Sequence, residues 1–253
     1  IASCLVGSEM CIRDRLWQLT APFDLRPQGQ DIIRTWLFST MLRSTLEDSR
    51  SPWRNAAISG FIVDPDRKKM SKSKGNVVTP ADILETHGSD AVRYWAASSR
   101  LGMDAAFDPQ NPTQVKIGRR LAIKVLNAAK FVLSFPVPEG AQVTHALDAS
   151  MLTGLDAVIE EATKAFENYD QAKALEVTEA FFWTFCDDYL ELVKERAYNQ
   201  NDVGQASAAL ALRLALSTLL RLLAPIISFA TEEVWSWFCL LYTSPSPRDK
   251  RQS

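Results

Sequence analysis

The sequence predicts a mainly α protein, in which the C-terminal part of an α/β domain is followed by an up-and-down helical bundle. The α/β part is indicated by residues 55–63, a short apolar run that ends at the turn Asp64-Pro65-Asp66 and is typical of a buried strand. The bundle is indicated by residues 113–238, where apolar residues recur with helical spacing and the connections are short and polar.

Turn and cap residues set the elements of the α/β part. Residues 16–27 read as a loop and a strand, and Asp31 is expected to be the N-cap of a helix over residues 32–42. Thr79 and Ser89 are expected to cap the two short helices that follow, because a side-chain oxygen at this position accepts a hydrogen bond from the first helical turn.

The bundle helices are expected at residues 113–135, 147–168, 171–198, 206–223 and 226–238. On the third of them, four large side chains recur at helical spacing and are expected to face a core, namely Phe182, Phe185, Tyr189 and Leu192. Trp183 and Trp235 are also expected in the core.

Composition bounds the possible functions. The chain has 253 residues, is 47% hydrophobic and 23% charged, and carries a net charge of −2, which is typical of a globular protein. With a sequence pI near 5.8, any nucleic-acid partner would need a local basic stripe. No apolar run is expected to span a bilayer. His87 and His145 cannot form a His-rich metal site, and the single cysteines show no Cys-x-x-Cys spacing, so we expect no metal site and a reduced cytoplasmic setting. A monomer is expected as well.

The two ends resemble translated sequencing-adaptor DNA. Residues 5–15 read LVGSEMCIRDR and residues 239–249 read CLLYTSPSPRD. The reverse complement of DNA that encodes the first segment can be read as CLLYTSPSPR, so both ends correspond to opposite strands of one duplex. The alternatives are a signal peptide and a disordered tail, but the first segment lacks the apolar stretch of a signal peptide. We therefore expect residues 1–15 and 239–253 to be foreign to the protein.

The segment most informative about chemistry is the loop at residues 69–76, KMSKSKGN. Three lysines among small polar residues and a glycine suit a mobile phosphate ligand, because each ammonium is a compact charge on a long stem and backbone N–H groups can approach an anion. Such a loop can stabilise charge on a leaving pyrophosphate. The alternative is a solvated basic turn without function.

This loop matches letter for letter the KMSKS signature of class I aminoacyl-tRNA synthetases, and the extended form is similar to the valyl, isoleucyl and leucyl branch. The resemblance implies a Rossmann-like catalytic domain over residues 16–110, with ATP and its Mg²⁺ as ligands. It implies that Lys69 and Lys72 hold the β and γ phosphates and that the Met70 backbone meets the adenine. It also implies that Ser71 and Ser73 complete the ATP-binding loop.

A second stretch, GQDIIRTW at residues 29–36, resembles the nucleotide-side motif of the same family. The resemblance implies that Gly29 lets the backbone approach the nucleotide and that Asp31 accepts the ribose hydroxyls. It also implies that Trp36 walls the amino-acid pocket. Asp31 is equally explained as an N-cap, and Trp36 as a core residue.

Residues 111–238 resemble the anticodon-binding bundle of the same branch, in the stretches LNAAKF, the segment from Trp183 to Tyr198, and LLAP through EEVW. This implies tRNA as a partner. A candidate phosphate-contacting stripe lies near one face of the first long helix and contains Lys116, Arg119, Arg120 and Lys124. The alternative is a solvated helix face.

Within the branch, the wording RPQGQDIIRTWLFSTML looks most like the valyl members, which implies valine and tRNA(Val) as substrates. An isoleucyl or leucyl type stays open. His87 and His145 cannot form the family's other signature, His-x-Gly-His, so we expect this chain alone to be inactive. Two other classes also remain possible, a stand-alone tRNA-binding helical module and a purely structural helical domain.

Overall fold

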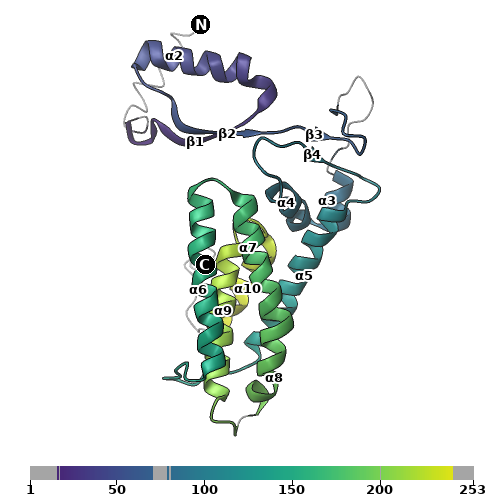
Figure 1. The fold of residues 1–253 in the computed structure, drawn as a ribbon, viewed down its shortest axis with the longest axis vertical. Helices are drawn as coiled ribbons and strands as arrows, with labels where there is room; N and C mark the ends of the chain where they lie inside the picture. The colour runs from purple at the N-terminus through teal and green to yellow at the C-terminus, as the bar shows by residue number, and fades with distance from the viewer. Residues whose placement is uncertain (1–15, 17, 71–78, 80, 200, 242–253) are drawn as a thin grey trace, which may run out of the picture. The chain divides into compact units, whose positions relative to one another are not determined.

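The structure is a computed structural model that describes residues 16, 18–70, 79, 81–199 and 201–241 (Figure 1). The chain divides into two compact units, each of which is described by itself. The first unit contains the described residues within 1–70 and 101–106. The second unit contains the described residues within 71–100 and 107–253.

The first unit is built on a parallel β-α-β arrangement. Strand β1 (Phe23–Gly29) pairs in parallel with β2 (Trp53–Ser59), so that Gly29 lies opposite Ser59. The crossover contains a 3₁₀ turn, η1 (Gln30–Ile32), a π-helical turn, η2 (Ile33–Leu37), and the helix α2 (Phe38–Asp48). A second parallel pair joins β3 (Ile62–Val63) to β4 (Ala105–Ala106). A parallel pair needs such a crossover, so the predicted α/β character is confirmed.

The predicted strand over residues 55–63 is wrong in two respects. It is split into β2 and β3, and most of β2 is exposed or half-buried. The split follows from the segment that passes beside Gly60, where a Cβ atom would lie 2.1 Å from the Met103 carbonyl oxygen. The Gly102 N–H donates to the Ile58 carbonyl at 2.8 Å and so holds this segment against the end of β2.

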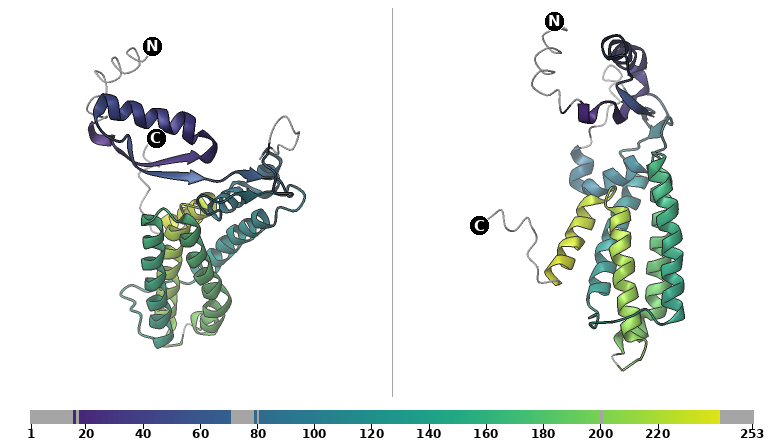
Figure 2. Two further views of the ribbon diagram at one scale, coloured as in Figure 1. Left: turned by 45° about the horizontal axis from the view of Figure 1, so that its top comes forward. Right: turned by 90° about the vertical axis from the view of Figure 1, so that its left-hand side faces the viewer.

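The second unit is helical throughout its described part (Figure 2). Two short helices come first, α3 (Ala81–His87) and α4 (Ser89–Ala97). The bundle follows, with α5 (Thr113–Leu133), α6 (Ala146–Glu167), α7 (Gln171–Thr184), the π-helical turn η4 (Phe185–Tyr189), α8 (Leu190–Tyr198), α9 (Gln205–Leu223) and α10 (Ser228–Leu241). The predicted helices are confirmed, but the connection between α5 and α6 runs over residues 134–145 and is not short. Ser89 is the first residue of α4, whose N-cap is Gly88, so that cap assignment is wrong by one residue.

The long helix predicted over residues 171–198 contains the wide turn η4, which the sequence pattern did not reveal. A π-helical turn adds one residue relative to an α-helix and shifts the buried face of everything that follows. Phe182, Phe185 and Tyr189 are buried as predicted, but Leu192 is 67% exposed. Val193 and Ala197 are buried where Leu192 was expected to be, so the buried face of the helix continues through them.

The core of the bundle is centred on α9, which lies beside α6 and α8 and supplies a run of buried leucines and alanines (Figures 1 and 2). By length and composition alone α9 is apolar enough to cross a membrane, so the prediction that no run reaches this length is wrong. Its Leu212, Leu216 and Leu219 are nevertheless almost fully buried against other helices. This burial is that of a core helix.

Helix α4 is fastened to the bundle by two charged side chains one turn apart. The Asp90 carboxylate accepts hydrogen bonds from the Phe229 and Ala230 N–H groups at 3.0 and 2.7 Å, and so satisfies the N-terminal turn of α10. Arg93 donates to the carbonyls of Pro225 and Ile226 at 2.7 and 2.9 Å. These bonds tie the helix pair α3–α4 to the far end of the bundle sequence.

Candidate functional site

Gly29 and Asp31 lie where β1 ends, which is the end of a parallel strand at which ligands commonly bind. Asp31 is not the N-cap that we expected, because it lies inside η1 and makes no capping hydrogen bond. Its carboxylate instead pairs with the Lys69 ammonium at 3.7 Å. A Cβ atom on Gly29 would lie 2.8 Å from the Asp31 Oδ1 atom, so a side chain at position 29 would displace this carboxylate.

A tight hairpin places Lys69 against these residues. The Asp64 N–H donates to the Lys68 carbonyl at 2.9 Å and the Lys68 N–H donates to Asp64 Oδ1 at 2.7 Å. Lys69 then pairs with Val63 in an antiparallel bridge, and its ammonium lies 3.9 Å from the centre of the Phe61 ring. The predicted turn at residues 64–66 therefore has a function in the fold, since it returns the chain beside β3.

Three of the predicted ligand-binding residues are thus brought together in the first unit, namely Gly29, Asp31 and Lys69. Met70 follows directly and is half-buried. Ser71, Lys72 and Ser73 lie outside the described residues. Phe61, which supports the Lys69 side chain, was not among the predicted site residues, and nothing in its spacing marks it.

Trp36 lies on η2 and is 37% exposed, so it is not a core residue of the described structure. Its ring stacks on Trp53 with the centroids 5.8 Å apart and the planes at 10°. The Arg26 guanidinium lies 4.0 Å from the Trp36 ring centre. The indole therefore forms a supported, partly open surface.

The basic stripe on α5 divides into two pairs of side chains. Lys116 donates to the Asn111 side chain at 3.0 Å, and Arg119 donates to the Thr86 carbonyl at 2.7 Å, near the end of α3. Arg120 and Lys124 instead lie over the Trp183 ring, with 5.3 and 5.7 Å to its centre. Trp183 is half-buried at the edge of the core, and so is Trp235, so the expectation that both tryptophans are core residues holds only in part.

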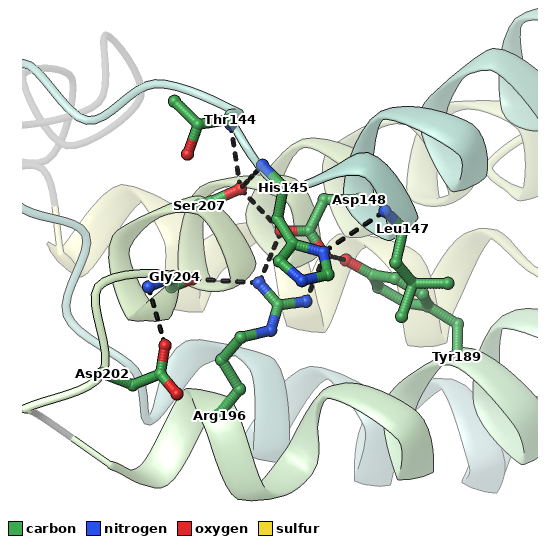
Figure 3. A network of polar contacts seen from close by, with 9 residues as sticks. All are labelled: Thr144, His145, Leu147, Asp148, Tyr189, Arg196, Asp202, Gly204 and Ser207. Atoms are coloured by element: carbon green, nitrogen blue, oxygen red, sulfur yellow. Dashed lines mark hydrogen bonds and ion pairs between the residues drawn. The ribbon is translucent and has the colours of Figure 1, made fainter.

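A buried polar network joins α6, η4, α8 and α9 (Figure 3). The fully buried Asp148 accepts two hydrogen bonds from Arg196, at 2.6 and 2.8 Å, one from Ser207 at 2.6 Å and one from Tyr189 at 2.8 Å. Burial alone would raise the pKa of Asp148, but these hydrogen bonds outweigh it and hold the pKa below its usual range. The residues are far apart in the sequence, so the network cannot be predicted from their spacing.

The second unit also contains a free cysteine, Cys186, which is buried on η4. Burial raises the pKa of the Cys186 thiol to about 12, so the thiolate needed for reactivity is scarce at neutral pH. Within the described ranges, no group of three or more His, Cys, Asp or Glu side chains could hold a metal ion.

Two family models match the chain. Residues 13–108 match "tRNA synthetases class I (I, L, M and V)" and residues 148–251 match "Anticodon-binding domain of tRNA ligase". The valine–tRNA ligase of Leifsonia xyli is 72% identical over 89% of this chain and 26% of that protein. The enzyme of the same name from Thermobifida fusca is 62% identical over 88% of this chain and 25% of that protein.

Solved structures show the same fold. A methionyl-tRNA synthetase of Mycobacterium tuberculosis bound by methionyl-adenylate aligns with a TM-score of 0.69 at 23% identity, covering 87% of this chain and 45% of that one. A LeuRS of Agrobacterium radiobacter K84, in a ternary complex with tRNA and LeuAMS, aligns with a TM-score of 0.64 at 22% identity, covering 85% of this chain and 27% of that one.

The chain therefore belongs to the class I tRNA synthetases. Within that class it belongs to the valyl-tRNA synthetases, and it spans about a quarter of the length of the curated relatives that it matches. The choice of the valyl members over the isoleucyl and leucyl ones, made from residues 26–42, is confirmed.

Proposed function

We propose that this chain contributes one side of the ATP site and the tRNA-docking bundle to an enzyme that activates valine with ATP and transfers it to tRNA(Val) in the cytoplasm. The observation that carries the proposal is the grouping of Gly29 and Asp31, at the end of a parallel strand, with Lys69, the first residue of the KMSKS loop. In that reaction a carboxylate attacks the α-phosphate of ATP, and positioning and charge stabilisation contribute more than covalent catalysis.

The contacts of Lys69 suggest how Gly29, Asp31 and Lys69 would bind the nucleotide together. In the structure, the ammonium lies 3.7 Å from the Asp31 carboxylate and 3.9 Å from the centre of the Phe61 ring. With ATP, which carries Mg²⁺, Asp31 would accept the ribose hydroxyls, and Lys69 would turn to the β and γ phosphates together with Lys72 of the same loop. The Gly29 and Met70 backbones would approach the nucleotide, while Ser71 and Ser73 would complete the loop. Trp36 would wall the valine pocket with its partly open face.

Activity of the chain by itself tests how much of the site it contains. We expect no valine-dependent ATP–pyrophosphate exchange above background, because His87 and His145 cannot supply the second signature and a partial set of donors does not form a preorganised site. The assay is isotope exchange into ATP, with a full-length valyl enzyme as the positive control. Exchange that depends on both valine and this chain would contradict the expectation.

Binding of tRNA tests the stripe formed by Lys116, Arg119, Arg120 and Lys124. The affinity for tRNA should be weak and should fall as salt rises, because each phosphate contact releases condensed counterions. Arg119→Glu and Arg120→Glu should each weaken binding in a fluorescence-anisotropy titration. Lys130→Glu is the matched control, since Lys130 is exposed on the same helix but lies outside the stripe. Binding that stays constant across the salt series would remove the stripe from the proposal.

A further inference from the structure

A cavity of about 510 Å³ opens beside the basic stripe and is lined by Arg120, Lys124, Trp183 and Asp187. The first two residues come from α5, Trp183 comes from α7 and Asp187 from η4. The lining therefore contains two cations, one carboxylate and one aromatic face. Only the two cations were identified from the sequence, because Trp183 and Asp187 are about sixty residues away along the chain.

Contacts with Glu179 and Phe182 hold the Trp183 ring in a fixed orientation. Its Nε1–H donates to Glu179 Oε1 at 3.1 Å, and the other oxygen of Glu179 accepts from the Tyr94 hydroxyl at 2.6 Å. Tyr94 is itself buried, and Phe182 meets Trp183 edge to face. The indole is therefore a rigid floor, and cations over such a ring lose less freedom when they bind a ligand.

The two cations above this floor differ in their partners. Lys124 donates to Asp187 Oδ1 at 2.9 Å, and this hydrogen bond raises the pKa of the Lys124 ammonium, which stays charged. Arg120 lies over the ring and has no hydrogen bond or ion pair with any side chain in the part of the chain that the structure describes. The lining thus holds two cations and one carboxylate, and this carboxylate, Asp187, is hydrogen-bonded to Lys124 rather than to Arg120.

We propose that Arg120 and Lys124 bind one phosphate of an RNA backbone above the Trp183 ring, and that Asp187 takes the place of this phosphate in the RNA-free protein. A phosphodiester offers several oxygens to a planar guanidinium and an ammonium together, whereas Asp187 reaches only Lys124. The proposal rests on the proposed function, in which tRNA is the partner. It adds that Asp187 competes with RNA and therefore lowers the affinity of the free protein.

Replacing the competitor tests this competition directly. Asp187→Asn should raise the affinity for a tRNA(Val) transcript roughly two- to fivefold, the range that corresponds to one lost exposed ion pair. Asp188→Asn is the matched control, because it removes the same charge from the next residue, which is exposed and does not line the cavity. At about 0.15 M salt, where screening acts over roughly 8 Å, it should change the affinity much less. Arg120→Ala should lower the salt slope of binding by about one.

The outcomes separate the cavity from the proposed function. Equal gains for Asp187→Asn and Asp188→Asn, or no gain for either, would overturn the phosphate site while leaving tRNA binding intact. No tRNA binding by the parent chain would overturn both. A parallel titration with inorganic pyrophosphate distinguishes the source of the phosphate, since a gain for pyrophosphate without a gain for tRNA would exclude an RNA backbone. Circular dichroism of each variant confirms that it is folded.

Discussion

Asp148→Ala is expected to lower the free energy of unfolding by about 3–5 kcal/mol, the usual effect of removing one partner from a buried ion pair. The carboxylate is fully buried and accepts four hydrogen bonds, two of them from the guanidinium of Arg196 (Figure 3). Alanine would leave the Arg196 charge, only 12% exposed, with a single carbonyl partner at Gly204. Chemical denaturation followed by circular dichroism measures the change.

Two comparisons make this result specific. Asp156→Ala removes a carboxylate from the exposed side of the same helix and should change stability by less than about 0.5 kcal/mol. Replacing Asp148 by leucine and Arg196 by methionine together should cost less than the sum of the single changes, because no buried charge is then left unpaired. Additive losses in this double-mutant cycle would show that the two side chains stabilise the bundle independently.

The same carboxylate predicts a pH dependence of stability. Since its pKa is lower in the folded state than in the unfolded chain, its contribution is present above the unfolded value of about 3.9 and is lost as the pH falls through the folded value. The unfolding free energy of the parent chain should therefore fall on acidification below about pH 4. In Asp148→Asn this part of the fall should be absent, and an unchanged pH profile would contradict the assignment.

The bundle was predictable because its helices bury a repeating apolar face and end at polar connections that local pattern reveals. The exceptions lie where distant segments meet. The wide turn η4 moved Leu192 out of the core, and the passage of residue 103 beside Gly60 split the expected strand. Local propensity contains neither effect, because each depends on what the tertiary structure places next to the residue.

The candidate site was partly predictable in its grouping. Gly29, Asp31 and Lys69 were predicted as ligand-binding residues because each stands in a recognisable short motif, and the structure places Asp31 beside both Gly29 and Lys69. Asp31 was assigned a capping role that it does not have, because a cap residue and an ion-pair partner look alike in sequence. Asp187, Glu179 and the Asp148 network were missed, since their partners are dozens of residues away and only the fold brings them together.

In a full-length valyl-tRNA synthetase that carries this segment, Lys69→Ala is expected to lower the rate of adenylate formation by about 10²–10³, the usual loss for one donor that meets charge developing in the transition state. The Michaelis constant for valine should change little, since an interaction made mainly in the transition state affects the chemical step rather than binding. Lys69→Arg should restore only part of the rate, because a planar fork replaces a compact charge. Lys72→Ala, in the part of the loop outside the described residues, should act in the same direction.

Lys68→Ala is the control for Lys69→Ala, because its ammonium pairs with Asp66 at 3.3 Å on the exposed hairpin and has no part in the grouping around Asp31. Its rate should stay near that of the parent enzyme. Both variants should keep the melting temperature, since exposed ion pairs such as Lys69–Asp31 contribute only about 0–1 kcal/mol to folding. Single-turnover kinetics separates the possible outcomes. A steep rise in the Michaelis constant for valine with an unchanged rate of adenylate formation would show that Lys69 contributes to ground-state binding. Equal rates for Lys69→Ala and Lys68→Ala would indicate that the loop is a solvated basic turn without function.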